Sequence, residues 1–211
     1  MELVNRYQAL TSQQLAYLLS MRHETMQHYL SLYRESGYFT VETCLKPYIY
    51  RLSSKGARII GARPHVSTSV RAYQHLCHRN QALFSLRGLF PDSEIRLLPK
   101  KAFYRFGLQP APIYEHPIAI NDRFGLMLVD DGGSSISRIK SAWFRDHKPH
   151  SSFDPSPLIA AGKPIISRWT TLNPELFLFS SRSRKKIDQA LKRYSVPAKV
   201  FPLELLWELG E

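Results

Sequence analysis

A short apolar segment that ends in two carboxylates and two glycines constrains the fold of this chain most. Residues 124–129 (FGLMLV) are too few for a free-standing helix and have polar residues on both sides, so they predict a buried strand. Asp130 and Asp131 follow at its carboxyl end, and Gly132 and Gly133 come next. We expect this strand to lie at the centre of a domain.

The carboxylates around this strand form a candidate metal site. Asp122 precedes the strand, and Lys140 follows one or two turns into a helix-like segment. Carboxylate oxygens suit a hard cation such as Mg²⁺ or Mn²⁺, and a lysine steadies developing negative charge during phosphodiester cleavage. The candidate catalytic set is Asp122, Asp130, Asp131 and Lys140, with Asp122 and Asp131 as metal ligands. The alternative is a polar turn that closes the strand, since Asp and Gly dominate turns.

The charge balance predicts a polyanionic partner. The chain has 211 residues, with 29 Lys+Arg against 17 Asp+Glu and a net charge of +12. Such an excess on a chain with 44% hydrophobic residues indicates a globular protein that binds nucleic acid. The length allows one large domain or two small ones.

Cysteine usage and hydropathy exclude several other classes. Cys44 and Cys77 belong to no metal-ligand spacing, which argues against a zinc site and against a disulfide framework. No apolar run approaches the length of a membrane span, and the N-terminal residues lack the apolar core of a secretion signal. We therefore expect a cytoplasmic protein with no membrane partner.

Residues 1–64 predict a winged helix-turn-helix domain. The run T-S-Q-Q from Thr11 is a capping box that begins a helix at about Ser12. A second helix follows, with Met26, Tyr29, Leu30 and Tyr33 as its apolar stripe, and ends near Gly37. Two strand-like runs, residues 38–43 and 48–52, and a short helix to residue 61 complete the winged order.

In a winged helix the second helix enters the major groove of DNA, and the hairpin contacts the backbone or the minor groove. The polar residues in these positions are Arg22, His23, Thr25 and His28 on the helix, and Lys46 and Arg51 on the hairpin. The alternative is a winged helix used for dimerisation or protein contact, with these charges only solvating its surface.

Residues 65–211 predict a second domain of α/β type. A long helix over residues 70–89 carries the run His78-Arg79-Asn80, and several strand-like runs follow it. His75 and His78 are three residues apart, but a third metal ligand is missing, so a structural or DNA-facing role is favoured. The last helix, within residues 181–194, has a cluster of cations at its start: Arg182, Arg184, Lys185 and Lys186.

This order of motifs resembles the replication-relaxation family. Among its relatives, it resembles the MobC-type mobilisation relaxases of plasmids and integrative elements. The resemblance rests on LTSQQLAYLL, YRESGYF, YIYRLSSKGARIIG, the His78–Asn80 run, LMLVDDGGS and ELFLFSSRSRKKIDQALKRYS. It covers most of the chain with loose motifs. It implies a winged helix followed by a restriction-endonuclease-like, PD-(D/E)XK domain, which together are of the α+β class.

The resemblance also implies roles for individual residues. Asp122 would be the first strand acid, Asp130 or Asp131 the second, and Lys140 a lysine displaced onto the next helix. His78 and Asn80 match the outer positions of a His-Glu-Asn signature, whose centre here is Arg79. The family pattern has a glutamate two residues before an aspartate where this strand reads Val-Asp-Asp. Since a missing carboxylate removes a metal ligand, we expect a nuclease-like domain that is weakened as an enzyme or retained for DNA binding.

The resulting hypothesis is a DNA-binding protein of a mobile genetic element that acts in mobilisation or replication control. The first alternative is an active DNA-nicking relaxase that uses Mg²⁺ or Mn²⁺, and the second is a winged-helix transcriptional regulator or interaction adaptor. Double-stranded DNA at an origin or promoter is the expected partner. Other mobilisation proteins and a second copy of the chain are further candidates.

Overall fold

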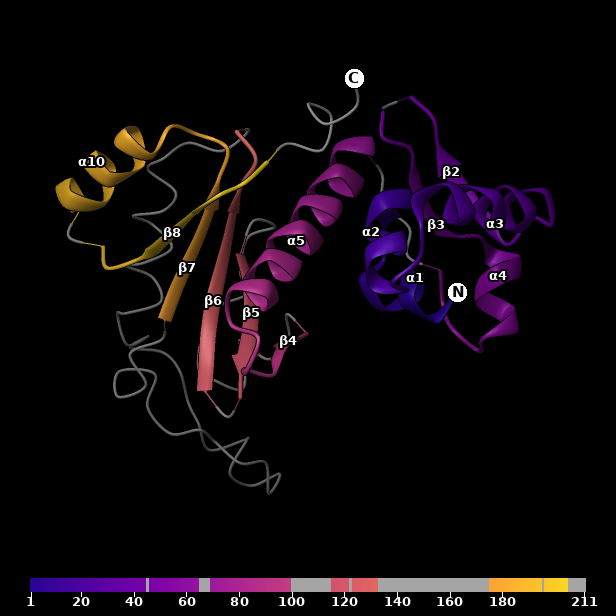
Figure 1. The fold of residues 1–211 in the computed structure, drawn as a ribbon, viewed down its shortest axis with the longest axis horizontal. Coiled ribbons are helices and arrows are strands. Elements are labelled where there is room, and N and C mark those ends of the chain that lie inside the picture. The colour runs from indigo at the N-terminus through magenta and orange to yellow at the C-terminus, as the bar shows by residue number, and fades with distance from the viewer. Residues whose placement is uncertain are drawn as a thin grey trace, which may run out of the picture. The chain divides into compact units, whose positions relative to one another are not determined.

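The fold mixes helices and strands in both halves of the chain, which confirms the α+β class (Figure 1). The computed structural model describes residues 1–44, 46–64, 69–99, 115–121, 123–132, 175–194 and 196–204. Its contacts divide the chain into two compact units, residues 1–81 with 204–211 and residues 82–203. We call them the N-terminal unit and the C-terminal unit.

The N-terminal unit packs short helices around a small sheet. Its elements are α1 (Glu2–Tyr7), β1 (Leu10–Thr11), α2 (Ser12–Leu18), α3 (His23–Glu35), β2 (Phe39–Glu42), β3 (Ile49–Leu52), α4 (Ser54–Ile59) and the first part of α5 (Val70–Leu89). The three strands form a sheet of order β1-β3-β2 with antiparallel pairing throughout. The predicted sequence of two helices, a hairpin and a helix is confirmed.

Side-chain capping explains where α2 begins. Thr11 Oγ1 accepts a hydrogen bond from the Gln14 backbone N–H at 3.2 Å, and Gln14 Oε1 accepts one from the Thr11 N–H at 3.1 Å. This reciprocal pair is the predicted capping box, and it satisfies two amides that the first turn of a helix leaves without partners. Gly37 follows α3 with a φ of 73°, the left-handed conformation that ends helices.

The apolar stripe predicted for α3 is only half buried. Met26 and Leu30 are 4% and 2% exposed and contribute to the core, whereas Tyr29 and Tyr33 are 46% and 38% exposed. The spacing of apolar residues assigned all four side chains to one face. The two tyrosines lie at the edge of that face, so they remain accessible at the surface of the unit.

The first part of α5 belongs to the N-terminal unit, which differs from the boundary between residues 64 and 65 predicted from the sequence. Tyr73 and Cys77 pack against Ala9 and Ile49 in one buried cluster. Burial raises the pKa of the Cys77 thiol to about 12, so the thiol stays protonated and packs as a small apolar group. The division therefore falls inside the helix, between Gln81 and Ala82.

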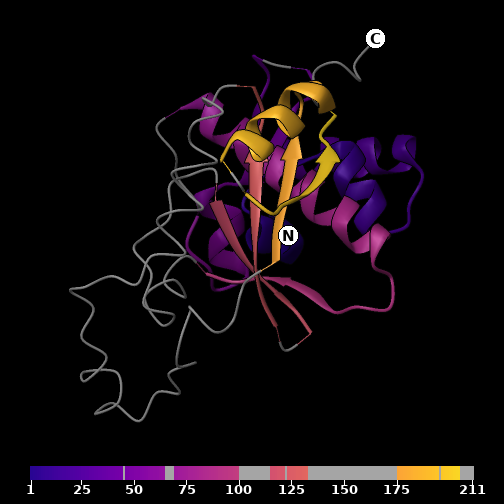
Figure 2. The same cartoon turned by 90° about the vertical axis from the view of Figure 1, so that its left-hand side faces the viewer.

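The C-terminal unit is built on a five-stranded mixed sheet. It contains the end of α5, β4 (Ile95–Leu97), β5 (Glu115–Ile120), β6 (Arg123–Asp130), β7 (Glu175–Ser180), α10 (Arg184–Tyr194) and β8 (Lys199–Pro202). The strand order is β4-β5-β6-β7-β8, antiparallel from β4 to β6 and parallel from β6 to β8. Figure 2 shows β6 and β7 pointing the same way, with α10 beyond their carboxyl ends.

The predicted central strand is confirmed as β6, the middle strand of this sheet. Every residue from Gly125 to Val129 in β6 and from Leu176 to Phe179 in β7 is buried, so both faces of the sheet are covered. The Phe90 ring, which follows α5, meets the Phe177 ring edge-on at 6.1 Å between centroids. Within the described part of the chain, none of the helices combines the length and apolar character that a membrane span requires.

Candidate nucleic-acid interface

The start of α3 presents the polar residues predicted to contact DNA. Arg22 occupies the N-cap position of the helix without a side-chain capping hydrogen bond and is exposed, and Thr25 and His28 are exposed on the helix surface. His23 is partly buried, because its Nε2 lies 2.8 Å from Ser12 Oγ at the start of α2. This hydrogen bond links the first turns of the two helices.

The two hairpin cations differ in their surroundings. Lys46 is exposed in the connection between β2 and β3. Arg51 is partly buried instead: its Nη2 donates to Glu42 Oε1 at 2.7 Å across the antiparallel pair, and its guanidinium lies 4.9 Å from the centroid of the Tyr73 ring. Lys46 is therefore the hairpin cation that is accessible to an anionic ligand, whereas Arg51 fastens the hairpin to α5.

Several further exposed cations of the N-terminal unit were not assigned from the sequence, and Arg34 and Arg58 are two of them. Arg34 lies in the last turn of α3, and Arg58 lies in the last turn of α4. Lysine and arginine near helix ends are common capping residues, so the sequence alone offered no reason to single them out. They add positive charge to a unit whose α3 also exposes Glu24 and Glu35.

The side chains of the His78–Asn80 run are buried rather than exposed to solvent. His78 and Asn80 are both 0% exposed. Asn80 Nδ2 donates to the Ala9 carbonyl at 2.7 Å and to the Tyr7 carbonyl at 3.2 Å, while its Oδ1 accepts from Arg79 Nε and Nη2 at 3.1 and 2.9 Å. A side chain without exposed surface cannot reach DNA in this conformation, so we leave His78 and Asn80 out of the interface.

Arg79 completes this buried network with neutral acceptors. Its guanidinium donates to the Tyr7 carbonyl at 2.7 Å and to Gln8 Oε1 at 3.2 Å, as well as to Asn80. Burial lowers the pKa of Arg79 to about 10, so the guanidinium is still charged at neutral pH. The network attaches α5 to the connection between α1 and β1, and it explains the polar run on this helix in structural terms.

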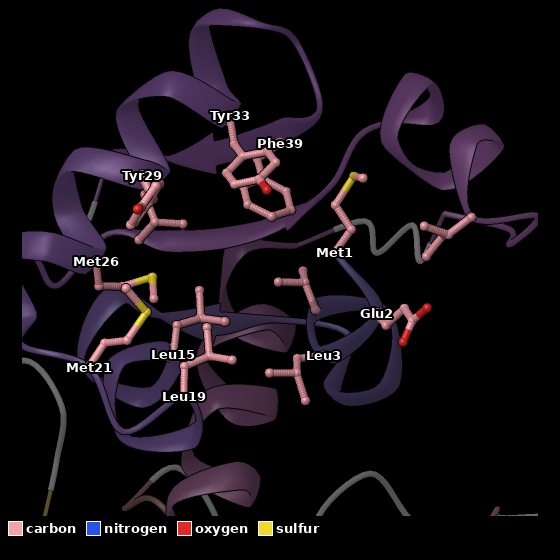
Figure 3. A pocket seen from close by; sticks show the side chains of 13 residues that line it. Met1, Glu2, Leu3, Leu15, Leu19, Met21, Met26, Tyr29, Tyr33 and Phe39 are labelled. Carbon is pink, nitrogen blue, oxygen red and sulfur yellow. The ribbon is translucent and has the colours of Figure 1, made fainter.

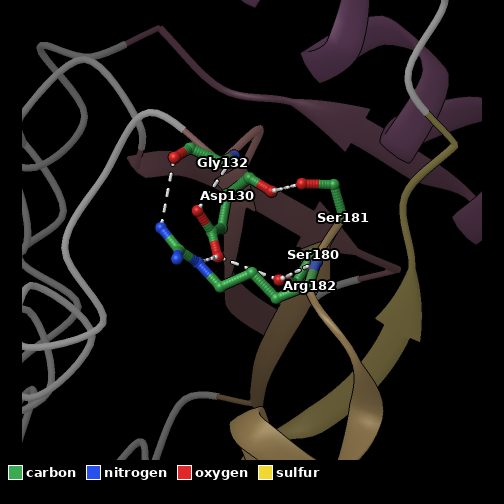
Figure 4. A network of polar contacts seen from close by, with 5 residues as sticks. All are labelled: Asp130, Gly132, Ser180, Ser181 and Arg182. Atoms are coloured by element: carbon green, nitrogen blue, oxygen red, sulfur yellow. Dashed lines mark hydrogen bonds and ion pairs between the residues drawn. The ribbon is translucent and has the colours of Figure 1, made fainter. Parts of the chain in front are cut away.

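Asp130 is held by donors from the end of the neighbouring strand β7 and the loop that follows it (Figure 4). Its Oδ2 accepts from Arg182 Nε at 2.8 Å and from Ser180 Oγ at 2.9 Å, and its Oδ1 accepts from the Gly132 backbone N–H at 3.2 Å. Arg182 Nη2 also donates to the Gly132 carbonyl at 3.2 Å. Both carboxylate oxygens are therefore engaged, and a metal ion there would have to compete with a guanidinium.

Of the other members of the predicted catalytic set, only Asp131 belongs to the described residues. Asp131 follows Asp130 and is partly exposed. Asp122 and Lys140 fall outside the described residues. Within the described ranges, no group of three or more His, Cys, Asp or Glu side chains is placed to hold a metal ion.

The ion pair between Asp130 and Arg182 gives a stability prediction. The Asp130 side chain is 7% exposed, so Asp130→Ala leaves a guanidinium, a hydroxyl and an amide without their acceptor and should cost about 2–4 kcal/mol. Asp188→Ala is the matched control, because Asp188 and Arg184 form an exposed pair four residues apart, which is worth about 0.3–0.5 kcal/mol. Urea unfolding followed by circular dichroism measures both, and equal losses would contradict the structural role of Asp130.

The cations of α10 form a basic surface with an apolar underside. Ile187 and Leu191 are buried, whereas Lys185, Lys186, Lys192 and Arg193 are exposed. Arg184 has partners within the unit: its Nε donates to Asp188 at 3.0 Å and its Nη1 to the Val200 carbonyl at 2.7 Å. Of the four predicted cations, Arg184, Lys185 and Lys186 are exposed, whereas Arg182 is partly buried in its pair with Asp130.

Comparison of this chain with protein-family models, with curated proteins and with solved structures finds no match in any of the three.

Proposed function

We propose that the chain binds double-stranded DNA through its N-terminal unit, which acts as a winged helix-turn-helix. The observation that carries the proposal is the order of the elements: α2 and α3 are followed by the β2–β3 hairpin, and β1 completes an antiparallel sheet of order β1-β3-β2. In this arrangement α3 is the helix that enters the major groove, and the hairpin is the wing.

The accessible residues support this assignment. Arg22, Thr25 and His28 are exposed at or near the start of α3, and Lys46 is exposed on the hairpin. Arginine, threonine and histidine can donate to phosphates or base edges, whereas a lysine at the wing adds affinity without sequence choice. The net charge of +12 favours a polyanion over a protein partner for this surface.

We propose a second, electrostatic contact at α10 of the C-terminal unit. Its exposed lysines follow one another at the start of the helix, and Asp188 is the one acidic residue of α10. The contact would neutralise phosphates without reading bases, so it should appear mainly in the salt dependence of binding.

The C-terminal unit is proposed to be a restriction-endonuclease-like domain that serves DNA binding rather than cleavage. The engagement of Asp130 by Arg182 supports this choice, because both carboxylate oxygens already accept hydrogen bonds. Together with the resemblance of the sequence motifs, this favours a DNA-binding protein of a mobile element that acts in mobilisation or replication control.

Fluorescence anisotropy with a labelled duplex tests the interface residue by residue. A high-affinity duplex is first selected from a random-sequence library with the full chain. For that duplex, we expect Arg22→Ala to weaken binding by about 1–3 kcal/mol, as the removal of a base or close phosphate contact does. Arg6→Ala is the matched control, because Arg6 is an exposed arginine on α1 and not on α3. Equal effects of the two substitutions would rule out α3 as the recognition helix.

The α10 contact has a different signature in the same assay. The Lys185→Ala/Lys186→Ala variant should reduce the slope of log affinity against log salt by about 2, roughly 1 for each phosphate that is no longer neutralised, and should weaken selected and random duplexes alike. An unchanged slope would remove α10 from the proposed interface and leave the assignment of α3 intact.

A further inference from the structure

The outer face of α3 carries an acidic residue within the proposed DNA interface. The inner face of the helix buries Met26 and Leu30, and Figure 3 shows Met26 beside Met21, which precedes the helix. Glu24 and His28 are both exposed and are four residues apart. Helical spacing places these two residues on one face, on the side opposite to Met26 and Leu30. Glu24 therefore lies on the face that α3 would present to DNA.

The two exposed glutamates of α3 differ in their contacts. Within the part of the chain that the structure describes, no hydrogen bond or ion pair engages the Glu24 carboxylate. Glu35, the last residue of the helix, accepts a hydrogen bond from Ser31 Oγ at 2.9 Å. Glu24 lies in the first turn, where a carboxylate also stabilises the helix dipole. Its oxygens are accessible to a ligand that can donate hydrogen bonds.

A carboxylate at this position has a specific consequence for DNA binding. Glu24 lies in sequence between Arg22 and Thr25, and residues at the start of a recognition helix are those that reach base edges. Phosphates repel a carboxylate, so the acid weakens binding to DNA in general. The repulsion is offset only where a base offers a hydrogen-bond donor. A repulsive group of this kind raises the discrimination between sequences.

The major groove limits which base can supply this donor. Guanine and thymine expose acceptors there, and adenine has the N7 acceptor next to its N6 amine. Cytosine presents its N4 amine and no acceptor of its own. A carboxylate therefore suits cytosine, whereas a glutamine side chain, which both donates and accepts, suits adenine.

We propose that Glu24 is a specificity-determining residue of the interface, which accepts a hydrogen bond from the N4 amine of a cytosine in the major groove. The inference rests on the proposed function of the N-terminal unit and deepens it, because it assigns a base to a position of α3. It also gives a role to an exposed acid on a chain with a net charge of +12.

Anisotropy titrations that combine protein variants with base-pair replacements test this assignment. Each C·G pair of the duplex selected with the full chain is replaced in turn by A·T, and each duplex is titrated with the unmodified chain and with Glu24→Gln. At one position we expect the unmodified chain to prefer C·G by at least about fivefold, the lower end for a specific base contact. Glu24→Gln should lose this preference or reverse it towards A·T.

Glu35→Gln is the matched control, because it removes the same charge from the other end of the same helix. Both glutamates are exposed, so neither substitution opens the core. Both variants should bind a random duplex more tightly, since each loses a charge that repels phosphates, but only Glu24→Gln should change a base preference. Weaker binding of the random duplex by Glu24→Gln would indicate a structural role for Glu24 and overturn the inference.

The outcomes separate this inference from the proposal on which it rests. If the unmodified chain binds no duplex, the proposed DNA-binding function fails and the role of Glu24 fails with it. If the chain prefers the selected duplex and Glu24→Gln keeps every base preference, the interface stands and the role of Glu24 is overturned. The same change of preference in Glu35→Gln would also overturn it, because loss of charge alone would then explain the result.

Discussion

Replacing Asn80 with alanine is expected to lower the free energy of unfolding of the N-terminal unit by about 3 kcal/mol or more. The Asn80 amide makes four buried hydrogen bonds, two as donor to the Tyr7 and Ala9 carbonyls and two as acceptor from Arg79. Alanine leaves the Ala9 carbonyl without this donor and deprives a buried guanidinium of an acceptor. Buried polar groups that lose their partners incur the full cost of desolvation, and charged groups incur more.

Circular dichroism during thermal unfolding measures this loss, because most described helices lie in the N-terminal unit. For a unit of this size the midpoint should fall by more than about 10 °C. Asn5→Ala is the control, since Asn5 is an exposed asparagine on α1, and its effect should stay within about 0.5 kcal/mol. A loss at Asn80 no larger than that at Asn5 would contradict a structural role for the His78–Asn80 run.

The second large effect is expected from Gly56→Ala in α4. A methyl group at Gly56 would overlap the carbonyl oxygen of Tyr38 and would lie 3.2 Å from Leu52 Cδ2. The Tyr38 carbonyl cannot easily retreat, because it accepts a hydrogen bond from the Ser53 N–H at 3.0 Å, just before α4 begins. We expect a loss of about 3 kcal/mol, at the upper end for overpacked sites.

The same change from glycine to alanine is expected to have the opposite effect on stability at Gly88 in α5. A methyl group at Gly88 would meet no atom within 4 Å, and alanine favours the helix by up to about 1 kcal/mol over glycine. Urea unfolding should therefore show one destabilised and one slightly stabilised variant. If both variants were stabilised, helix propensity rather than the close approach of α4 to Tyr38 would decide the outcome.

Local signals in the sequence predicted most of the elements. The Thr11–Gln14 capping box, the glycine after α3 and the short apolar run that became β6 are each patterns of a few neighbouring residues. The bounds of the long helix, Val70–Leu89, were also predicted, because its apolar residues keep helical spacing. Features that depend on neighbouring residues in the chain were thus within reach of sequence analysis.

Features that depend on contacts between distant residues could not be predicted from the sequence. Asp130 and Arg182 are 52 residues apart, and the register that pairs Asp130 with Ser180 brings them together. The same holds for Asn80, which donates to the Tyr7 and Ala9 carbonyls more than 70 residues earlier in the chain. The sequence does not show whether a polar residue of an amphipathic helix faces solvent or a buried carbonyl. The burial of Asn80 was therefore visible only in the structure.

The central claim, that α3 and the hairpin recognise DNA, is tested most directly by comparing a duplex selected from a random library with an unselected duplex of equal length. Anisotropy titrations of the full chain at two salt concentrations give both affinities. We predict that the selected duplex binds at least about a thousandfold tighter at moderate salt, and that both affinities fall steeply as salt rises. Equal affinity for the two duplexes, or no measurable binding to either at low salt, would contradict the claim.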